Sequence, residues 1–272
     1  RSVGFFLLIG FLWNDFGSPA VLIKSIPKIH LDPLGGNTVQ YVLVWFFIAA
    51  WTFIDPGFYQ RCAAAESPEV AKKGLLISIG GWMVFDSLTV LAGLYAVALI
   101  QTDQALLSFP LLGQFILPIG FFGLFITGLF ATIMSTIDSL SLISAITFGR
   151  DILWRIQRQK SDSNPVPLVR KSLIIISFLS LFFAFSVPSV VRLFYLIGSI
   201  LIPGLILPFL FTLWTEKMAL SELLVSQWII TPVIISLVWL GISQIEGQSL
   251  FGIEPFYPGM LSSILIGYFV IK

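Results

Sequence analysis

A carboxylate and several hydroxyl groups lie inside one of the longest apolar runs of the chain. The stretch FATIMSTIDSLSLIS (130–144) carries Thr132, Ser135, Thr136, Asp138 and Ser139. On a helix the four hydroxyl residues share a sector of about 100°, and Asp138 lies on the shoulder of that sector. Hydroxyl and carbonyl oxygens are hard ligands, so this face suits a hard monovalent cation rather than a soft metal.

The hydroxyl groups also have a purely structural explanation. Ser and Thr side chains commonly join membrane helices to one another through hydrogen bonds. A carboxylate within a membrane span is rare, however, and is a functional candidate by default. Asp138 therefore favours a site, while a protonated carboxyl or one hydrogen-bonded to a neighbouring helix stays open.

A second apolar run is interrupted by residues that break a helix. The stretch AAWTFIDPGFYQRC (49–62) contains Asp55, Pro56 and Gly57. Proline removes a backbone donor and glycine loosens a helix. In lipid the freed carbonyls need partners, and discontinuous helices of this kind build binding sites in secondary transporters. The alternative is a helix that simply ends with Asp55 at the membrane interface.

The composition shows which elements must position these residues. The chain has 272 residues, 57% hydrophobic and 11% charged, with a mean hydropathy of +0.98. Soluble domains are about a quarter charged, so this is the composition of an integral membrane protein. Its apolar segments do not alternate in the ten-residue units of membrane strands, so we expect an all-α fold. The net charge of +1 gives no reason to expect a nucleic-acid partner.

The chain offers little for an intramembrane enzyme. It contains one cysteine, Cys62, and one histidine, His30, and no paired carboxylates. A catalytic triad, a His-built metal centre and an intrachain disulfide are therefore not expected. The chain begins at Arg1 and ends at Lys272, each next to an apolar segment, so we expect a fragment of a longer protein.

About eight apolar segments approach or exceed the roughly 17 residues that a membrane helix needs. The fourth is too long for one span, and its beginning is expected to be a separate outer turn that ends near Pro118. The segments lie at about 3–22, 40–60, 74–100, 112–148, 172–187, 190–214, 223–243 and 257–271.

Basic residues predict the orientation, because cytoplasmic loops carry an excess of Lys and Arg. One set of alternate loops holds ten basic residues and the other set holds three, so loops 61–73, 150–171 and 215–221 are expected to be cytoplasmic. Acidic residues Asp103, Glu246 and Glu254 lie in the opposite loops. The ten basic residues of the first set of loops are Arg61, Lys72, Lys73, Arg150, Arg155, Arg158, Lys160, Arg170, Lys171 and Lys217. The three of the opposite set are Lys24, Lys28 and Arg192.

Three stretches together resemble the sodium/solute symporter family. They are DPGFYQRCAAAESPEVAKKG (55–74), ATIMSTIDSLSLISAITFGRDI (131–152) and IGSILIPGLILPFLFTLW (197–214). The resemblance implies a LeuT-type fold of two inverted five-helix repeats. It makes 1–272 a single transmembrane domain, with core helices five to ten at about 1–214 and peripheral helices at about 222–272. The first four core helices would then be missing.

The resemblance also implies a sodium site between the first and eighth core helices. Its eighth-helix ligands fall on the hydroxyls of Ser135 and Thr136 and on the backbone carbonyl of Thr132. Asp138 and Ser139 belong to the same motif. Asp138 is not expected to bind sodium directly; it either orients the helix or serves a proton or a second cation.

The resemblance supports particular substrate contacts less strongly than it supports the sodium ligands. Trp51 falls where sugar carriers have an inner aromatic gate, and Asp55 falls where proline carriers have a glutamine. Ile48 and Tyr195 replace two polar sugar contacts, which disfavours a sugar substrate. For Trp51 and Tyr195, core packing or interfacial anchoring is the alternative.

The expected function is sodium-coupled symport of a small organic solute by alternating access, in the cell membrane. A proton-coupled carrier and a membrane sensor that retains the transporter fold are the alternatives. The expected partners are sodium, the solute and the lipid bilayer, and homo-oligomerisation stays open.

Overall fold

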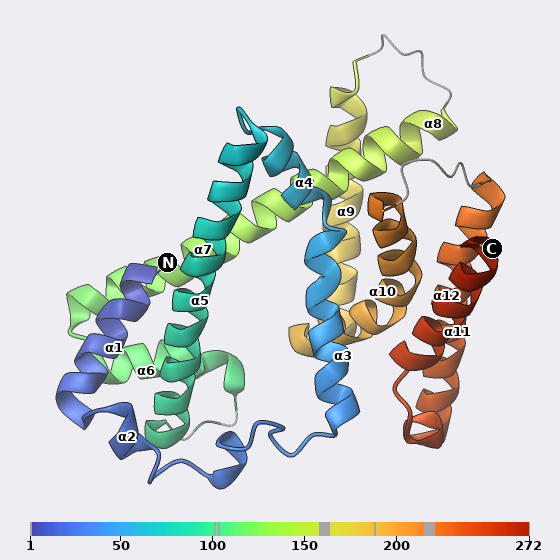
Figure 1. Ribbon diagram of the computed structural model, residues 1–272. Helices are drawn as coiled ribbons and strands as arrows, with labels where there is room; N and C mark the ends of the chain where they lie inside the picture. Colours follow the sequence, from blue (N-terminus) through green and yellow to red (C-terminus); the bar gives the residue numbers. More distant parts are fainter. Residues whose placement is uncertain are drawn as a thin grey trace. The chain divides into compact units, whose positions relative to one another are not determined.

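The computed structural model describes residues 2–100, 102, 104–157, 164–187, 189–214 and 221–271. All regular elements in these ranges are helices (Figure 1). The prediction of an all-α integral membrane protein is therefore confirmed. Six helical stretches are long and apolar enough to cross a membrane, namely Val39–Ala63, Pro68–Leu99, Ile119–Ile156, Val166–Ser186, Val190–Leu213 and Glu222–Glu246. The first and last predicted segments form shorter apolar helices, Val3–Phe16 and Phe256–Val270.

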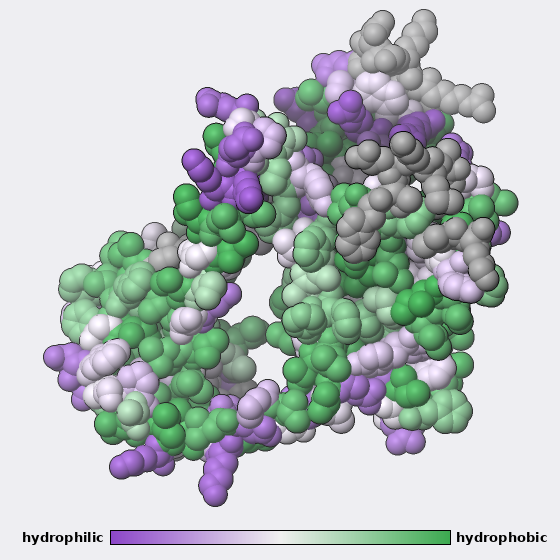
Figure 2. Space-filling view, viewed as in Figure 1, coloured by the Kyte–Doolittle hydropathy of each residue, from purple (hydrophilic) through white to green (hydrophobic). Residues whose placement is uncertain are grey.

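Hydrophobic side chains cover most of the visible surface (Figure 2). Large residues such as Phe185 and Phe269 are 84% and 74% exposed. A soluble protein rarely exposes apolar area on this scale, whereas a bilayer solvates it. Of the charged residues used to predict orientation, Asp103, Arg158, Lys160 and Lys217 lie outside the described residues.

The chain forms two compact units. The first comprises Arg1–Gly35 and Ala65–Phe182. Its helices are α1 (Ser2–Phe16), α2 (Pro19–Leu22), α5 (Pro68–Leu99), α6 (Ser108–Ile116), α7 (Ile119–Ile146), α8 (Trp154–Ile156) and most of α9 (Val166–Ser186). Short 3-10 turns lie at Lys28–His30 and Ala105–Leu107.

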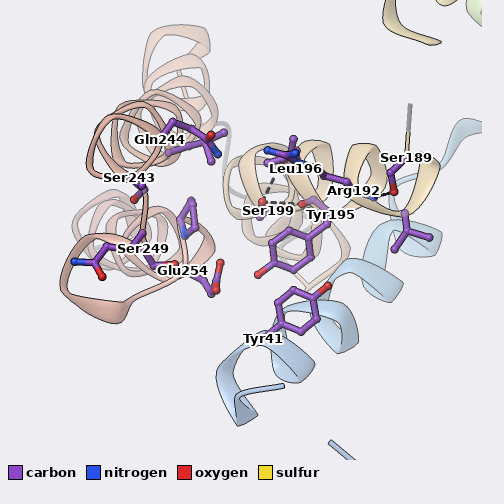
Figure 3. A pocket seen from close by; sticks show the side chains of 15 residues that line it. Tyr41, Ser189, Arg192, Tyr195, Leu196, Ser199, Ser243, Gln244, Ser249 and Glu254 are labelled. Carbon is purple, nitrogen blue, oxygen red and sulfur yellow. Dashed lines mark hydrogen bonds between the residues drawn. The ribbon is translucent and has the colours of Figure 1, made fainter. Parts of the chain in front are cut away.

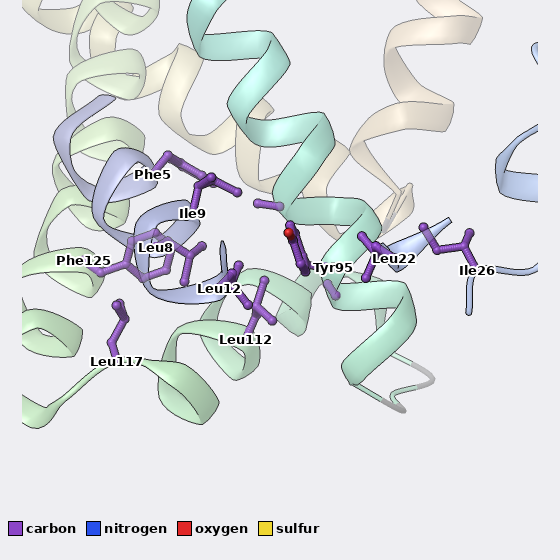
Figure 4. Packing of buried hydrophobic residues seen from close by; sticks show 12 residues of the cluster. Phe5, Leu8, Ile9, Leu12, Leu22, Ile26, Tyr95, Leu112, Leu117 and Phe125 are labelled. Carbon is purple, nitrogen blue, oxygen red and sulfur yellow. The ribbon is translucent and has the colours of Figure 1, made fainter. Parts of the chain in front are cut away.

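The core of the first unit forms where α1 packs against α5, α6 and α7 (Figure 4). The ring of Phe5 meets Phe85, Phe109 and Phe125 edge to face, with centroids 5.3–5.6 Å apart. The buried Tyr95 donates its hydroxyl to the carbonyl of Gly17 at 2.7 Å, which fixes the turn after α1.

The long fourth segment is divided as predicted. Helix α6 ends at Ile116, Leu117 is extended, and Pro118 precedes α7, because proline has no N–H to continue the earlier helix. A π-helix over Thr147–Leu153 then joins α7 to α8, which the sequence did not predict. Within it, Gly149 approaches α9 so closely that a Cβ would lie 2.9 Å from Ser172 Oγ.

The second unit comprises Gly36–Ala64 and Phe183–Lys272. Its helices are α3 (Val39–Ala49), α4 (Pro56–Ala63), α10 (Val190–Trp214), α11 (Glu222–Glu246) and α12 (Phe256–Ile271), with 3-10 turns at Ala50–Phe53 and Leu250–Gly252. Helices α10, α11 and α12 pack against one another, and α3 packs on α10. Gly198 allows that approach, because a Cβ there would lie 2.7 Å from Ile48 Cγ1.

Candidate functional site

The predicted sodium ligands lie on one helix, α7, in the first unit. Thr132 is half-buried, whereas Ser135, Thr136, Asp138 and Ser139 are exposed. Within the described residues these four side chains are therefore not buried in a helix interface.

The hydroxyl groups on this face bond to the backbone of their own helix. Thr136 Oγ1 donates to the Thr132 carbonyl at 3.0 Å, and Ser139 Oγ donates to the Ser135 carbonyl at 2.9 Å. Such bonds satisfy a hydroxyl in a membrane helix without a partner from another helix. Two of the three predicted ligand oxygens, those of Thr132 and Thr136, are thus already adjacent. Both can face one cation if the Thr136 hydroxyl turns its proton away.

The donor chemistry of this face fits sodium rather than a soft metal. It consists of hydroxyl and backbone carbonyl oxygens, which are hard ligands. Among the described residues there is no group of three or more His, Cys, Asp or Glu side chains that could hold a metal ion. Sodium binding by Thr132, Ser135 and Thr136 stays a prediction, as do the roles of Asp138 and Ser139.

Another part of α7 packs against α1 in the same unit. Gly4 allows the contact, since a Cβ there would lie 3.2 Å from Phe125 Cδ2. A small cavity of about 140 Å³ lies between the two helices, and Thr132 borders it. The remaining lining residues are apolar or glycine, so the cavity itself offers little for binding an ion.

The predicted break in the second apolar run is present. Helix α3 ends at Ala49 and the 3-10 turn ends at Phe53, before Asp55 adopts extended angles (φ −74°, ψ 118°). The Asp55 carboxylate caps α4 by accepting a hydrogen bond from the Gly57 N–H at 2.6 Å. Pro56 occupies the first turn of α4, where its missing N–H costs nothing. Asp55 therefore has a structural role, and its contact with a solute stays a prediction.

We expect Asp55→Ala to lower the free energy of unfolding by about 1 kcal/mol, because it removes the helix cap. Asp55→Asn is the matched control, since the amide oxygen can accept the same bond and should restore stability. Thermal unfolding in detergent measures both. An Asn variant as unstable as the Ala variant would contradict the capping role. Loss of solute uptake in a stable Asn variant would identify the charge as a functional contact.

The other two substrate candidates lie in different surroundings within the second unit. Trp51 is 37% exposed on the 3-10 turn, whereas Tyr195 is buried. The ring of Tyr195 stacks on Tyr41 with centroids 4.8 Å apart and packs against Trp45 at 5.7 Å (Figure 3). Tyr195 also lines a pocket of about 560 Å³, and neither Trp51 nor Asp55 does. The three candidates are therefore not brought together in one pocket.

This pocket contains polar residues that were not predicted as site residues. They include Tyr41, Arg192, Gln244 and Glu254. Arg192 and Glu254 were used only to predict orientation, and nothing in their local sequence shows that they share a pocket. The position of Arg192 three residues before Tyr195, on one helix face, is the one signal that links a charge to a predicted contact.

The chain belongs to the sodium:solute symporter family, whose model matches residues 28–229. The match includes the broken segment, the α7 motif and α10, so the family resemblance is confirmed. Members of this family are transporters rather than enzymes, and the six long apolar helices make the chain a multi-pass membrane protein. No curated protein and no solved structure matches the chain.

Proposed function

We propose that this protein is a carrier that couples sodium entry to the uptake of a small organic solute by alternating access. The observation that carries the proposal is the face of α7, within the region that matches the family. There the Thr132 carbonyl and the Thr136 hydroxyl lie 3.0 Å apart, and Ser135 is the adjacent residue. Hard oxygen donors on a membrane-length helix suit a monovalent cation.

The proposed architecture is a LeuT-type fold in the cell membrane. Its support is the broken helix at Asp55, capped as α4 begins, since discontinuous helices build the binding sites of secondary transporters. Loops 61–73, 150–171 and 215–221 face the cytoplasm in this proposal. Their excess of Lys and Arg over the opposite loops supports this orientation under the positive-inside rule.

The residues of α7 provide the coupling. Sodium bound at the hydroxyl face holds the outward-open form and favours solute binding. Release of the ion to the cytoplasm removes that preference and lets the inner gate open. A ligand shifts a conformational equilibrium only by its difference in affinity for the two forms, so sodium must bind the outward-open form more tightly.

Proteoliposomes that contain the full-length protein test this function. A panel of labelled amino acids, carboxylates and sugars is offered under an inward sodium gradient, at the same pH on both sides. We expect at least one solute to accumulate above its outside concentration, and to stop doing so when potassium replaces sodium. Equal accumulation under a proton gradient without sodium would contradict sodium coupling. Solute binding with no accumulation under any gradient would instead favour a sensor.

A further inference from the structure

The pocket of the second unit contains a cationic and an anionic side chain that are not paired with each other. Arg192 comes from the first turn of α10, and Glu254 precedes α12 (Figure 3). Across the part of the chain that the structure describes, no ion pair is recorded for either side chain. The pocket volume of about 560 Å³ lies within the range typical of small-molecule sites.

We propose that this pocket binds a small zwitterionic solute, with its carboxylate at Arg192 and its ammonium group at Glu254. The proposal rests on the proposed function only in identifying this molecule as the solute to be carried. In the proposed orientation the pocket opens at the outer face, so it would load the solute before transport. A sugar would leave both charges uncompensated, and a simple ion would compensate only one.

Glu254 is positioned by a segment that is tied to α11. The indole N–H of Trp239 donates to the Ile253 carbonyl at 3.0 Å, next to Glu254 in sequence. The Ser243 hydroxyl accepts a hydrogen bond from the Leu250 N–H at 3.0 Å. The segment is therefore held by side chains of α11, and Glu254 is not on a free loop.

A second set of bonds ties the same segment to α3. The Gln40 side-chain amide donates to the Gly252 carbonyl. The Tyr257 hydroxyl, at the start of α12, donates to the backbone carbonyl of Gln40 at 2.7 Å. These bonds fix the carboxylate side of the pocket relative to the aromatic residues of α3. A site fixed in this way loses less entropy when it binds a ligand.

The aromatic floor of the pocket favours an ammonium group beside Glu254. Tyr195 is 9% exposed and its hydroxyl points toward the Glu254 carboxylate (Figure 3). This buried hydroxyl lies beside the Glu254 carboxylate and interacts with it, but makes no hydrogen bond of ordinary geometry to any described residue. An ammonium group placed between the two could accept from neither but donate to both oxygens, which satisfies the buried hydroxyl and the carboxylate together. The stacked rings of Tyr41 and Tyr195 also attract cations.

The opposite end of the pocket favours a carboxylate. Arg192 lies at the beginning of α10, where the aligned peptide dipoles of a 25-residue helix add positive potential. The backbone N–H of Arg192 donates to the Ser189 hydroxyl at 3.3 Å. The guanidinium of Arg192 remains available for a ligand. Gln244, from α11, points toward the same space (Figure 3). An arginine can bind a carboxylate through two parallel hydrogen bonds.

Equilibrium binding to the purified full-length protein, in detergent and without sodium, tests the proposal. The probes are glycine, β-alanine, 4-aminobutyrate and 5-aminovalerate, each compared with the amine and the carboxylic acid of the same length. Isothermal titration calorimetry measures the affinities. We expect one zwitterion to bind at least about tenfold more tightly than either singly charged analogue.

Two variants assign the two charges. Arg192→Gln should remove the preference for the zwitterion and weaken binding of the acid, but not of the amine. Glu254→Gln should also remove the preference and weaken binding of the amine alone. Glu246→Gln is the matched control, because this exposed carboxylate at the end of α11 does not line the pocket. It should bind every probe as the wild type does.

The outcomes separate this inference from the proposed function. If no probe is preferred as a zwitterion, or if Glu254→Gln binds it like the wild type, the inference is overturned. Zwitterion binding that persists in a protein without sodium-driven uptake would support the pocket and contradict sodium coupling. Sodium-driven uptake of an uncharged solute, unchanged in Arg192→Gln and Glu254→Gln, would support sodium coupling and contradict the zwitterion pocket.

Discussion

Thr136→Val is expected to raise the sodium concentration for half-maximal solute uptake by at least about tenfold. Valine keeps the shape of threonine but replaces the hydroxyl, one of the three proposed ligand oxygens on α7, with a methyl group. Uptake at a series of sodium concentrations, at constant ionic strength, measures the change. An unchanged sodium requirement would remove Thr136 from the site.

Thr127→Val is the matched control for this variant. Thr127 Oγ1 donates to the Gly123 carbonyl at 2.8 Å, the same bond within the helix that Thr136 makes. Thr127 lies outside the helix sector of the predicted ligands. Its replacement should leave the sodium requirement unchanged. If both variants shift it equally, the effect comes from the helix backbone rather than from a lost ligand.

Ser135→Ala is expected to have an effect similar to that of Thr136→Val, because it removes the other side-chain oxygen. Sodium-dependent uptake should collapse when both residues are replaced. Ser144→Ala, on the same helix but outside the ligand sector, serves as its control. Undiminished uptake with unchanged sodium affinity in Ser135→Ala would contradict the proposed ligand set.

Gly204→Ala should have the largest effect on stability, because Gly204 lies where α10 meets the backbone of α11. A Cβ at this position would clash with the Ile229 carbonyl oxygen and lie 2.7 Å from Val233 Cγ2. A backbone atom cannot move aside as a flexible side chain can. We therefore expect the free energy of unfolding to fall by about 1–3 kcal/mol, which thermal unfolding in detergent measures.

Gly241→Ala provides the comparison within the same helix pair. Gly241 lies inside α11, and a Cβ there would have no atom within 4 Å. This variant should be as stable as the wild type or slightly more so, because alanine is the better helix former. Equal destabilisation by the two variants would contradict the close contact between α10 and α11.

The helices were largely predictable because they depend on local composition. The predicted segment at 190–214 coincides with α10, and Pro118 separates α6 from α7 as expected. The break at Asp55 and Pro56 also follows from local chemistry, since proline and a capping carboxylate begin a helix wherever they occur together. These features need no knowledge of tertiary contacts.

Features that depend on distant residues were not predictable in the same way. The π-helix at Thr147–Leu153 goes with the close contact between Gly149 and Ser172, which is a tertiary property. Tyr195 was predicted as a substrate contact by resemblance, but its stacking on Tyr41 joins residues 154 positions apart. The charged pocket likewise depends on hydrogen bonds that tie Gln40 to the segment before α12.

The predicted sodium ligands were only partly predictable from the sequence. Helical periodicity alone placed the hydroxyls of α7 on one face, and the structure has them on one continuous helix. Their assignment as ligands came from the family resemblance, since the same hydroxyls also suit contacts between helices. The structure adds the adjacency of the Thr132 and Thr136 oxygens, which neither source had specified.

Equilibrium binding of radioactive sodium to the purified full-length protein tests the central proposal most directly. Wild-type protein and the double variant Ser135→Ala, Thr136→Val are compared, with Thr127→Val as the control. We predict saturable sodium binding that potassium does not displace, present in the wild type and the control and lost in the double variant. Sodium binding of unchanged affinity in the double variant would contradict the assignment of the site to α7.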